Sequence, residues 1–486
     1  MKVNLSGGVA RANINPPVGI LHTNWGAQTH EIARGIDMDL TATAVVLSDQ
    51  KKEIALVAVD IIGIDNELFD EIATKVENLA HIEKNNICIA ASHTHSGPTI
   101  SRLNRSWASK GVEAAKIYRK MLPEKIAGAV WEAKNSMIPV RINMGVGDCA
   151  INVNRRFTVP KDAKNSDGKP WHGNDVIVGR NWEGFVDREV KVVRIDDLNE
   201  NPIAIVVNYA AHGTSMAFEN QMLTPDYPGT MRKTVEDITG ATCLFFQGAS
   251  ANQGTIHDFG ADLNVYHHLG TVLGCEAAKI SLITHTLPKK EKLNYIMESG
   301  ADLAIYDEVP FNDSDSSINI INSSVNLPIK KVNASDKDGL NKRLNELETD
   351  LKNKIKRGSK EEVRIIIKNI RRTHFALRKV ELLSGKDTLK VGIQGIRIGN
   401  IAFITAPLEI FAEIGQEIKK NSPIKNTAIF GYANGSLGYL PTSESFETGG
   451  YEIGVTNFVE GADLLFQKAC IDVLEKLNNS KMTEYA

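Results

Sequence analysis

Two histidines separated by one residue are the part of this sequence whose residue types and spacing point most directly to chemistry. His93 and His95 lie in the segment ASHTHSGP, residues 91–98, which follows an apolar run over 86–91 that is typical of a buried strand. Successive side chains of a strand point to opposite faces, so these two imidazoles are expected to point the same way. Neutral imidazole is a common ligand for zinc. The pair predicts a metal site, although loop histidines that bind nothing also occur at this spacing.

Other apolar runs of the chain also end in side chains that can bind a metal or transfer a proton. These runs and the residues that follow them are 54–59 with Asp60, 203–211 with His212, 243–246 with Gln247 and Ser250, and 401–408 with Glu409. Runs that are apolar at every position are typical of strands covered on both faces. Ligands of such sheets gather beyond the carboxyl ends of the strands. We therefore expect these side chains to form one active site.

The elements that must position these residues indicate an α/β fold. Over residues 1–300, strand-like runs alternate with helical patterns at 67–80, 114–135 and 229–239. We expect a mixed sheet core covered by helices, formed by a single domain over 1–486. Residues 146–185 carry few regular signals, and we expect a long loop that shapes a site.

A different pattern covers residues 333–384 and predicts an αα-hairpin. Leu340, Leu344, Leu347 and Leu351 recur at helical spacing, and a second helical pattern continues to Leu377. The strand-like pattern resumes after residue 385, so we interpret the hairpin as an insertion within the domain that the core can lose. Its many basic residues could bind an acidic partner, but a solvated helix face explains them better.

Composition excludes several classes of protein. Among 486 residues the net charge is −3, which favours neither nucleic acid nor an anionic membrane as a partner, so a small molecule is expected. No apolar run has the length of a membrane span, and the first residues lack the apolar core of a secretory leader. Five scattered cysteines without a C-x-x-C pair are typical of reduced cysteines. We predict a cytoplasmic protein without stable membrane insertion, and the sequence leaves its oligomeric state open.

Seven short motifs in series resemble those of the neutral/alkaline, non-lysosomal ceramidase family. They are GVARANINP at 8–16, ASHTHSGP at 91–98, NYAAHGT at 208–214, DYPG at 226–229, FQGA at 246–249, GYAN at 431–434 and GYLPT at 438–442. The resemblance extends from about residue 8 to about residue 465 and is interrupted by the hairpin. It implies a zinc-dependent hydrolase of an amide.

The resemblance also assigns roles to individual residues. It implies Zn²⁺ held by His93, His212, Glu409 and Tyr439, with His95, Arg155 and Tyr451 as contacts of the scissile carbonyl or the substrate. Neighbouring residues compete with three of these assignments: Glu413 or Glu417 could take the place of Glu409, Tyr432 that of Tyr439 and Arg156 that of Arg155. The family has a Gly-Asp-x-Ser-Pro-Asn type of segment where this chain reads GASANQ at 248–253, so we interpret Ser250 as a substrate contact and not as a nucleophile.

The function expected from the sequence is hydrolysis of a linear amide, an N-acyl compound, in which zinc-bound water attacks a polarised carbonyl. Because we find neither a leader nor a C-terminal immunoglobulin-like domain in this sequence, we expect a small or polar N-acyl substrate in preference to membrane ceramide. Two alternatives are a ceramidase proper that acts on sphingolipid and a non-catalytic zinc-binding or docking protein. An amidohydrolase barrel is disfavoured, because its H-x-H pair normally lies on the first strand.

Overall fold

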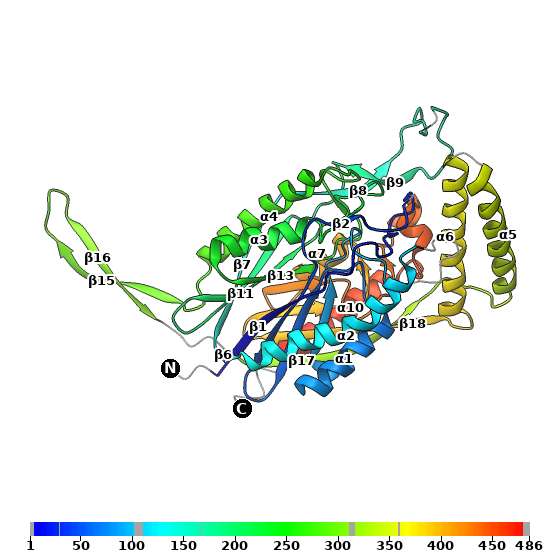
Figure 1. Ribbon diagram of the computed structural model, residues 1–486. Helices are drawn as coiled ribbons and strands as arrows, with labels where there is room; N and C mark the ends of the chain where they lie inside the picture. The colour runs from blue at the N-terminus through cyan, green and yellow to red at the C-terminus, as the bar shows by residue number, and fades with distance from the viewer. Residues whose placement is uncertain are drawn as a thin grey trace.

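The same order of secondary-structure elements occurs three times along the chain of this computed structural model (Figure 1). Each unit has one strand, an antiparallel pair of strands, a helix, a strand parallel to the one before that helix, and a final helix. The structure describes residues 4–28, 30–101, 110–166, 168–310, 316–357 and 360–479. Since no short motif repeats in the sequence, only the topology shows this threefold arrangement.

The bounds of the three units are as follows. The first contains β1 (Ser6–Asn13), β3 (Thr41–Ser48), β4 (Glu53–Val59), α1 (Asn66–Ala80), β5 (Ile87–Ala91) and α2 (Val112–Asn135). The second contains β7 (Arg141–Asp148), β10 (Glu189–Asp196), β11 (Pro202–Tyr209), α3 (Tyr227–Thr239), β13 (Thr242–Gln247) and α4 (Leu263–Ile283). The third contains β17 (Ile318–Pro328), β18 (Thr388–Ile398), β19 (Ile401–Thr405), α7 (Ala412–Lys420), β21 (Asn426–Phe430) and α10 (Ala462–Asn479).

Each unit forms its own mixed sheet. The orders are β5-β4-β3-β1-β6, with the short β6 (Ile138–Pro139) at one edge, then β13-β11-β10-β7, and β21-β19-β18-β17. The pairs β4–β5, β11–β13 and β19–β21 are parallel, and the other pairs of these sheets are antiparallel. The predicted α/β class is confirmed, and three open sheets take the place of the closed barrel that was disfavoured.

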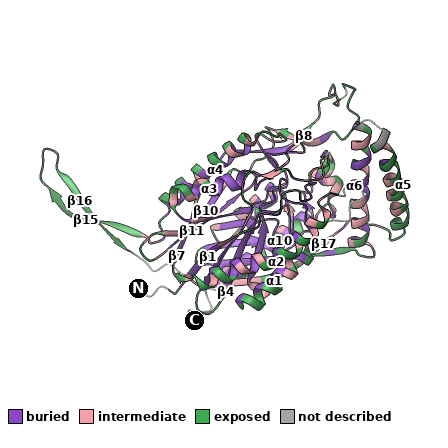
Figure 2. Cartoon of the chain, viewed as in Figure 1, coloured by how far each residue is buried: buried purple, intermediate pink, exposed green. Residues whose placement is uncertain are grey.

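The three sheets pack against one another through one face each. The opposite face of each sheet is covered by the helices of its own unit. Figure 2 shows the buried strands between layers of half-buried helices. Alternate residues of β11 illustrate the arrangement: Ile205 and Val207 pack in the cluster of α3 and α4, whereas Ala204 and Val206 pack in the cluster that all three sheets share. This two-sided burial explains why the strands are apolar at every position.

The ends of the parallel pairs meet at one place. The backbone N–H of Ala91, at the end of β5, donates to the carbonyl of Tyr432 after β21, and the N–H of Gly431 donates to the carbonyl of Gln247 at the end of β13. The first and second strands of the three units are joined by long connections, over 14–40, 149–188 and 329–387.

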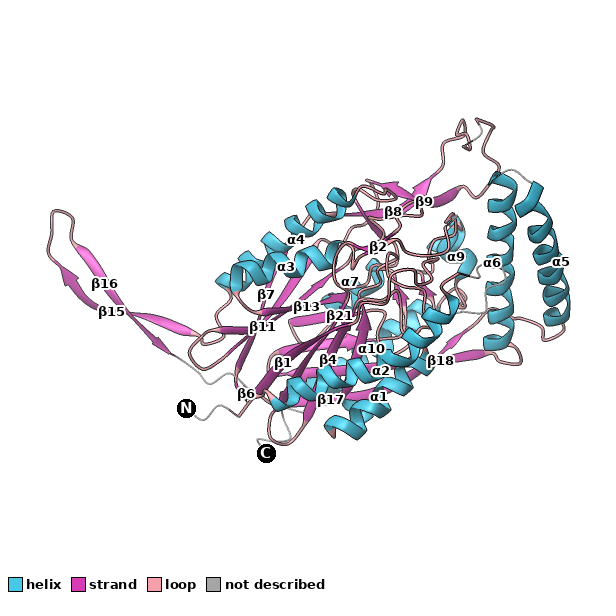
Figure 3. Cartoon of the chain, in the orientation of Figure 1, coloured by secondary structure: helices cyan, strands magenta, loops and turns pink. Residues whose placement is uncertain are grey.

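Residues 146–185, which we expected to form a loop, contain two strands (Figure 3). β8 (Asn152–Thr158) pairs with both β9 (Val176–Asn181) and β14 (Gln253–Thr255). The pairing is long-range, which explains why the local sequence shows little sign of it. The short strands β2 (Gly35–Ile36), β12 (Met222–Leu223), β20 (Glu409–Ile410) and β22 (Tyr439–Leu440), the helices α8 (Ser445–Thr448) and α9 (Tyr451–Val455), and one 3₁₀ turn (Lys84–Asn86) complete the connections of the units.

The predicted αα-hairpin is present as α5 (Asp336–Arg357) and α6 (Lys360–Leu383), which connect β17 to β18. Its basic residues Lys368 and Arg372 are exposed, whereas Leu351, Ile366 and Ile370 are buried in the core of the first unit. That the core can lose the hairpin stays a prediction. Arg371 donates to the carbonyl of Thr23, and Lys379 donates to that of Thr456. Residues 358 and 359 lie outside the described part, and that the hairpin is an insertion into the family fold stays a prediction.

At the opposite end from this hairpin, β15 (Lys289–Met297) and β16 (Leu303–Pro310) form a ribbon that projects from the body (Figure 1). Nearly all of its residues are exposed. Among the described residues, no helix combines the length and the apolar character needed to cross a bilayer.

Candidate metal centre

His93 and His95 converge for a different reason from the one the sequence suggested. β5 ends at Ala91, so both histidines lie in the loop after the strand. The backbone of His93 is left-handed, with φ of 61°, and its N–H donates to the carbonyl of Ile61 at 3.1 Å. A β-region conformation is the norm for such a residue, and a left-handed one is maintained only by the surrounding structure. The turn at His93, and not strand alternation, directs the two rings to one point.

His212 is brought to the same point by the second unit. The N–H of His95 donates to the carbonyl of Gly213 at 3.0 Å, and the N–H of His212 donates to the carbonyl of Gln253 at 2.9 Å. The buried side-chain amide of Gln247 donates to the carbonyl of Ala211 at 2.6 Å and, at 3.4 Å, to that of Ser92. Gln247 therefore joins the two loops that carry the histidines.

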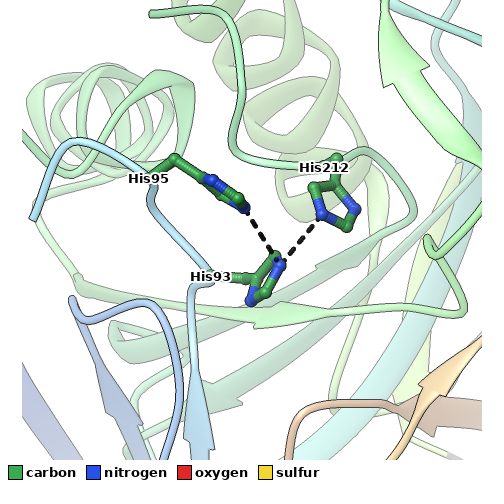
Figure 4. A group of neighbouring side chains, drawn as sticks. All are labelled: His93, His95 and His212. Carbon is green, nitrogen blue, oxygen red and sulfur yellow. Dashed lines mark hydrogen bonds between the residues drawn. The ribbon is translucent and has the colours of Figure 1, made fainter. Parts of the chain in front are cut away.

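The three rings present their Nε2 atoms to a common centre (Figure 4). His93 Nε2 lies 2.9 Å from His212 Nε2 and 3.3 Å from His95 Nε2. His93 Nδ1 lies 2.5 Å from the carbonyl oxygen of Ile62, and His212 Nδ1 lies 3.2 Å from that of Ser250. A carbonyl oxygen can only accept, so Nδ1 of each ring carries the proton and Nε2 keeps its lone pair. These carbonyls fix the tautomer that a metal ligand requires.

Burial keeps all three imidazoles neutral. It lowers the pKa of His93 to about 3 and lowers the pKa values of His95 and His212 well below 6.5. The nearby positive charge of Arg155 acts in the same direction. Neutral rings with free lone pairs are suited to bind a cation. Burial removes these nitrogen atoms from water, and a bound cation would supply the interaction that they lose.

A carboxylate completes the group. Glu409 Oε2 lies 3.7 Å from His93 Nε2 and 3.9 Å from His212 Nε2. The competing residues lie elsewhere: Glu413 accepts from the Asn252 side chain, and Glu417 accepts from Asn421. Among these three glutamates, Glu409 is the one whose carboxylate lies beside the histidines.

Tyr439 lies beside Glu409 because the two are register partners in the parallel ladder of β20 and β22. Paired residues of a ladder project to the same face. The Tyr439 hydroxyl accepts a hydrogen bond of 3.2 Å from Arg155 Nη2, and the ring of the half-exposed Tyr451 lies 5.8 Å from that of Tyr439. Arg155 on β8 is buried, whereas Arg156 turns away to the carbonyl of Gly449. The predicted residues Arg155, Tyr439 and Tyr451 thus form one wall of the site.

Tyr432, the alternative to Tyr439, contacts two of the histidines directly. Its ring centroid is 4.2 Å from that of His93, and its hydroxyl is 3.0 Å from Ser250 Oγ and 3.4 Å from His212 Nδ1. Ser250 is fully buried. Its carbonyl oxygen accepts from His212 Nδ1, and its hydroxyl hydrogen-bonds the hydroxyl of Tyr432. Both tyrosines remain close to the centre, and only Tyr439 is the register neighbour of Glu409.

Sequence reasoning missed several residues of this site. Glu452 binds Arg155 Nε at 2.9 Å and Arg156 Nη1 at 3.1 Å, and the ring of Trp25 lies 5.1 Å from that of His95. No local pattern marks either one as a site residue. Asp60, which we expected to join the active site with the other residues that follow apolar runs, is instead occupied by the guanidinium of Arg232 at 2.7 Å.

The fold and the histidine cluster together define an α/β protein with a candidate metal centre at converging strand ends. A model of the neutral/alkaline non-lysosomal ceramidase family, N-terminal part, matches residues 7–252, just over half of the chain. The chain belongs to this family. The resemblance seen in the motifs is thereby confirmed.

Individual relatives agree with this assignment. The neutral ceramidase of Oryza sativa is 23% identical over 253 residues, which are 50% of this chain and 30% of that protein, and that of Drosophila melanogaster is 25% identical over 240 residues, 46% of this chain and 30% of that protein. The matched part thus spans about a third of these relatives. A crystal structure of the Pseudomonas aeruginosa neutral ceramidase superposes with a TM-score of 0.67 at 18% identity, covering 99% of this chain and 75% of that one. The superposition shows a shared fold.

Proposed function

We propose that this protein is a zinc-dependent hydrolase of a linear amide, an N-acyl compound. The observation that supports the proposal most strongly is the convergence of three neutral imidazoles, two buried and one half-buried, with one carboxylate at the ends of strands from all three units. Membership of a family whose curated relatives are neutral ceramidases supports hydrolysis as the reaction.

The donor set suits zinc. Mixed nitrogen and oxygen ligands are typical of catalytic zinc, and two imidazole nitrogens bound to one tetrahedral ion are about 3.4 Å apart, close to the spacing present here. We assign His93, His212, Glu409 and Tyr439 as the residues that would hold the ion. Bound zinc supplies Lewis acidity, which polarises a carbonyl and makes water acidic near neutral pH.

The remaining residues act on the substrate. His95 has a buried Nδ1 without a hydrogen-bond partner and an Nε2 that faces the centre, so it can hydrogen-bond the scissile group. The hydroxyl of Tyr451 can donate a hydrogen bond to the carbonyl oxygen as negative charge develops on that oxygen. The buried guanidinium of Arg155 holds Tyr439 in place and contributes a positive charge that favours this oxyanion.

The substrate class and the metal can be tested together on the wild-type protein. We expect about one zinc per chain by elemental analysis, and a higher kcat/KM for short soluble N-acyl amines than for long-chain ceramide in detergent. A preference for ceramide of more than about tenfold, ~1.4 kcal/mol of transition-state stabilisation, would favour the ceramidase alternative. Bound zinc without hydrolysis of any acyl amide or ester would favour the non-catalytic alternative. The cytoplasm stays our proposed compartment, which the five free cysteines support.

Ser250→Ala is expected to retain measurable turnover. A mechanism that uses activated water needs no serine nucleophile, and the Ser250 hydroxyl is occupied by Tyr432. The measurement is kcat on a short N-acyl amine together with zinc content. A trapped acyl-Ser250 adduct, or complete loss of activity with zinc still bound, would contradict the proposed mechanism.

A further inference from the structure

The helix α6 of the hairpin binds two segments that lead to the candidate metal centre. Arg371 Nη2 donates a hydrogen bond of 3.0 Å to the carbonyl of Thr23, in the connection from β1 to β3. Lys379 Nζ donates to the carbonyl of Thr456 at 3.0 Å and to that of Gly454 at 3.3 Å, at the C-terminal end of α9. Figure 3 shows α9 beside α6. The two cationic residues are ~12 Å apart along the helix axis, so one rigid element holds both segments.

Lys379 holds a helix that is too short to be stable alone. α9 is a single turn, and a helix of this length depends on tertiary contacts. Lys330 Nζ also donates to the carbonyl of Ile453 at 2.6 Å, so two lysines bind the end of α9. Cations are favourable there, because the last carbonyls of a helix have no partner within it. Burial and the nearby charge of Lys330 lower the pKa of Lys379 to about 8, so the position of Lys379 costs free energy that its contacts with α9 must offset.

The end of α9 is linked in turn to the wall of the site. Thr456 is fully buried, its hydroxyl donates to the carbonyl of Tyr439 at 2.7 Å, and its N–H donates to the carbonyl of Glu452 at 2.8 Å. Tyr451 is the first residue of α9, and its ring lies 5.8 Å from that of Tyr439. Because α9 has only one turn, a shift of Thr456 would also move Tyr451.

Arg371 holds the segment that contacts His95. Thr23 is buried, and its N–H donates to the hydroxyl of Thr99 at 2.8 Å. Two residues further along the chain, the ring of Trp25 lies 5.1 Å from that of His95. The carbonyl that Arg371 binds is thus part of the backbone that places Trp25 against this histidine.

We propose that Lys379 and Arg371 of α6 are positioning residues for the two side chains that we assign to the scissile group. Lys379 acts on Tyr451 through α9, and Arg371 acts on His95 through Trp25. The proposal rests on the proposed function, which gives both side chains their roles. The proposed metal ligands have backbone contacts of their own, which include the ladder of β20 and β22. The hairpin therefore supports turnover and not metal binding.

The experiment replaces each cation with an unbranched apolar side chain. In Lys379→Met and in Arg371→Met, kcat on a short N-acyl amine is expected to fall by about tenfold or more, because a small misplacement of groups that act in the transition state lowers the rate strongly. KM and zinc content should stay near the wild-type values. Lys379→Arg keeps a cationic donor and should restore most of kcat. Lys368→Met removes an exposed lysine of α6 and is the matched control, which should keep the wild-type kcat.

Hydrogen–deuterium exchange measures the positioning without a substrate. Lys379→Met is expected to speed exchange over 451–458, and Arg371→Met over 21–28, whereas general destabilisation would speed it throughout the chain. If the wild type hydrolyses no acyl amide, the proposed function has failed, and the exchange alone decides whether α6 holds these segments. Wild-type kcat in both variants, or wild-type exchange in both segments, overturns the proposal. Loss of zinc together with kcat also overturns it, because α6 would then support the metal centre itself. The two contacts are separate, so either variant carries the test if the other does not fold.

Discussion

Replacing His93 or His212 with Ala is expected to remove the metal and to lower kcat/KM by at least about a thousandfold, ~4 kcal/mol of transition-state stabilisation. The two Nε2 atoms lie 2.9 Å apart, and a backbone carbonyl contacts Nδ1 of each ring, so the lone pairs of both rings are directed to the same point. Loss of one ligand also leaves the ion with fewer donors than the tetrahedral set that zinc prefers. The measurements are zinc content per chain and kcat/KM on a short N-acyl amine.

His95→Ala is the informative comparison for these variants. We assign His95 to the substrate, so this variant should keep its zinc and lose turnover. If His95→Ala loses the metal as well, the ligands are the three histidines and the assignment of Tyr439 is wrong. Full zinc content in both His93→Ala and His212→Ala would exclude a metal centre at this position. His30→Ala, a partly exposed histidine of the first connection, is the control for histidine removal in general.

Glu452→Ala is expected to destabilise the fold by about 3–5 kcal/mol and to lower activity as well. Glu452 is 2% exposed and neutralises two guanidiniums, of which that of Arg155 is 4% exposed. Without the carboxylate, the buried guanidinium of Arg155 keeps only the hydroxyl of Tyr439 as a hydrogen-bond partner among the residues that the structure describes. Arg155 then no longer holds that tyrosine in one orientation, so the residue that we propose as a metal ligand is no longer fixed. The free energy of unfolding in urea and kcat/KM are the two measurements.

Glu447→Ala provides the matched control for Glu452→Ala. Glu447 lies on α8, five residues away, and is exposed, so its removal should change the stability by less than about 0.5 kcal/mol. Glu452→Gln, which keeps the hydrogen bonds and loses the charge, should fall between the two. A loss of less than about 1 kcal/mol in Glu452→Ala would contradict the view that this ion pair supports the site.

The sequence by itself determined the class of fold and the kinds of side chain at its strand ends. Runs such as 54–59, 203–211 and 401–408 are apolar at each position, and this local property is sufficient to predict covered strands. The residues after them, among them His212 and Glu409, could be selected because ligands of an α/β sheet lie beyond the carboxyl ends of its strands. The two helices of 333–384 were also predictable, since helical spacing is a local pattern. The roles of His93, Glu409 and Tyr439 came from the family resemblance, and these roles stay predictions.

Only the tertiary structure decided how these pieces meet. The choice of Glu409 over Glu413, and the position of Arg155 against Arg156, depend on contacts between segments that are more than two hundred residues apart in the sequence. The left-handed turn at His93 and the ion pairs of Glu452 leave no local signal, because each depends on residues that are distant in the sequence. The packing of α6 into the first core is of the same kind. A chain's periodicity reports which face of an element is apolar, and it does not report which distant element covers that face.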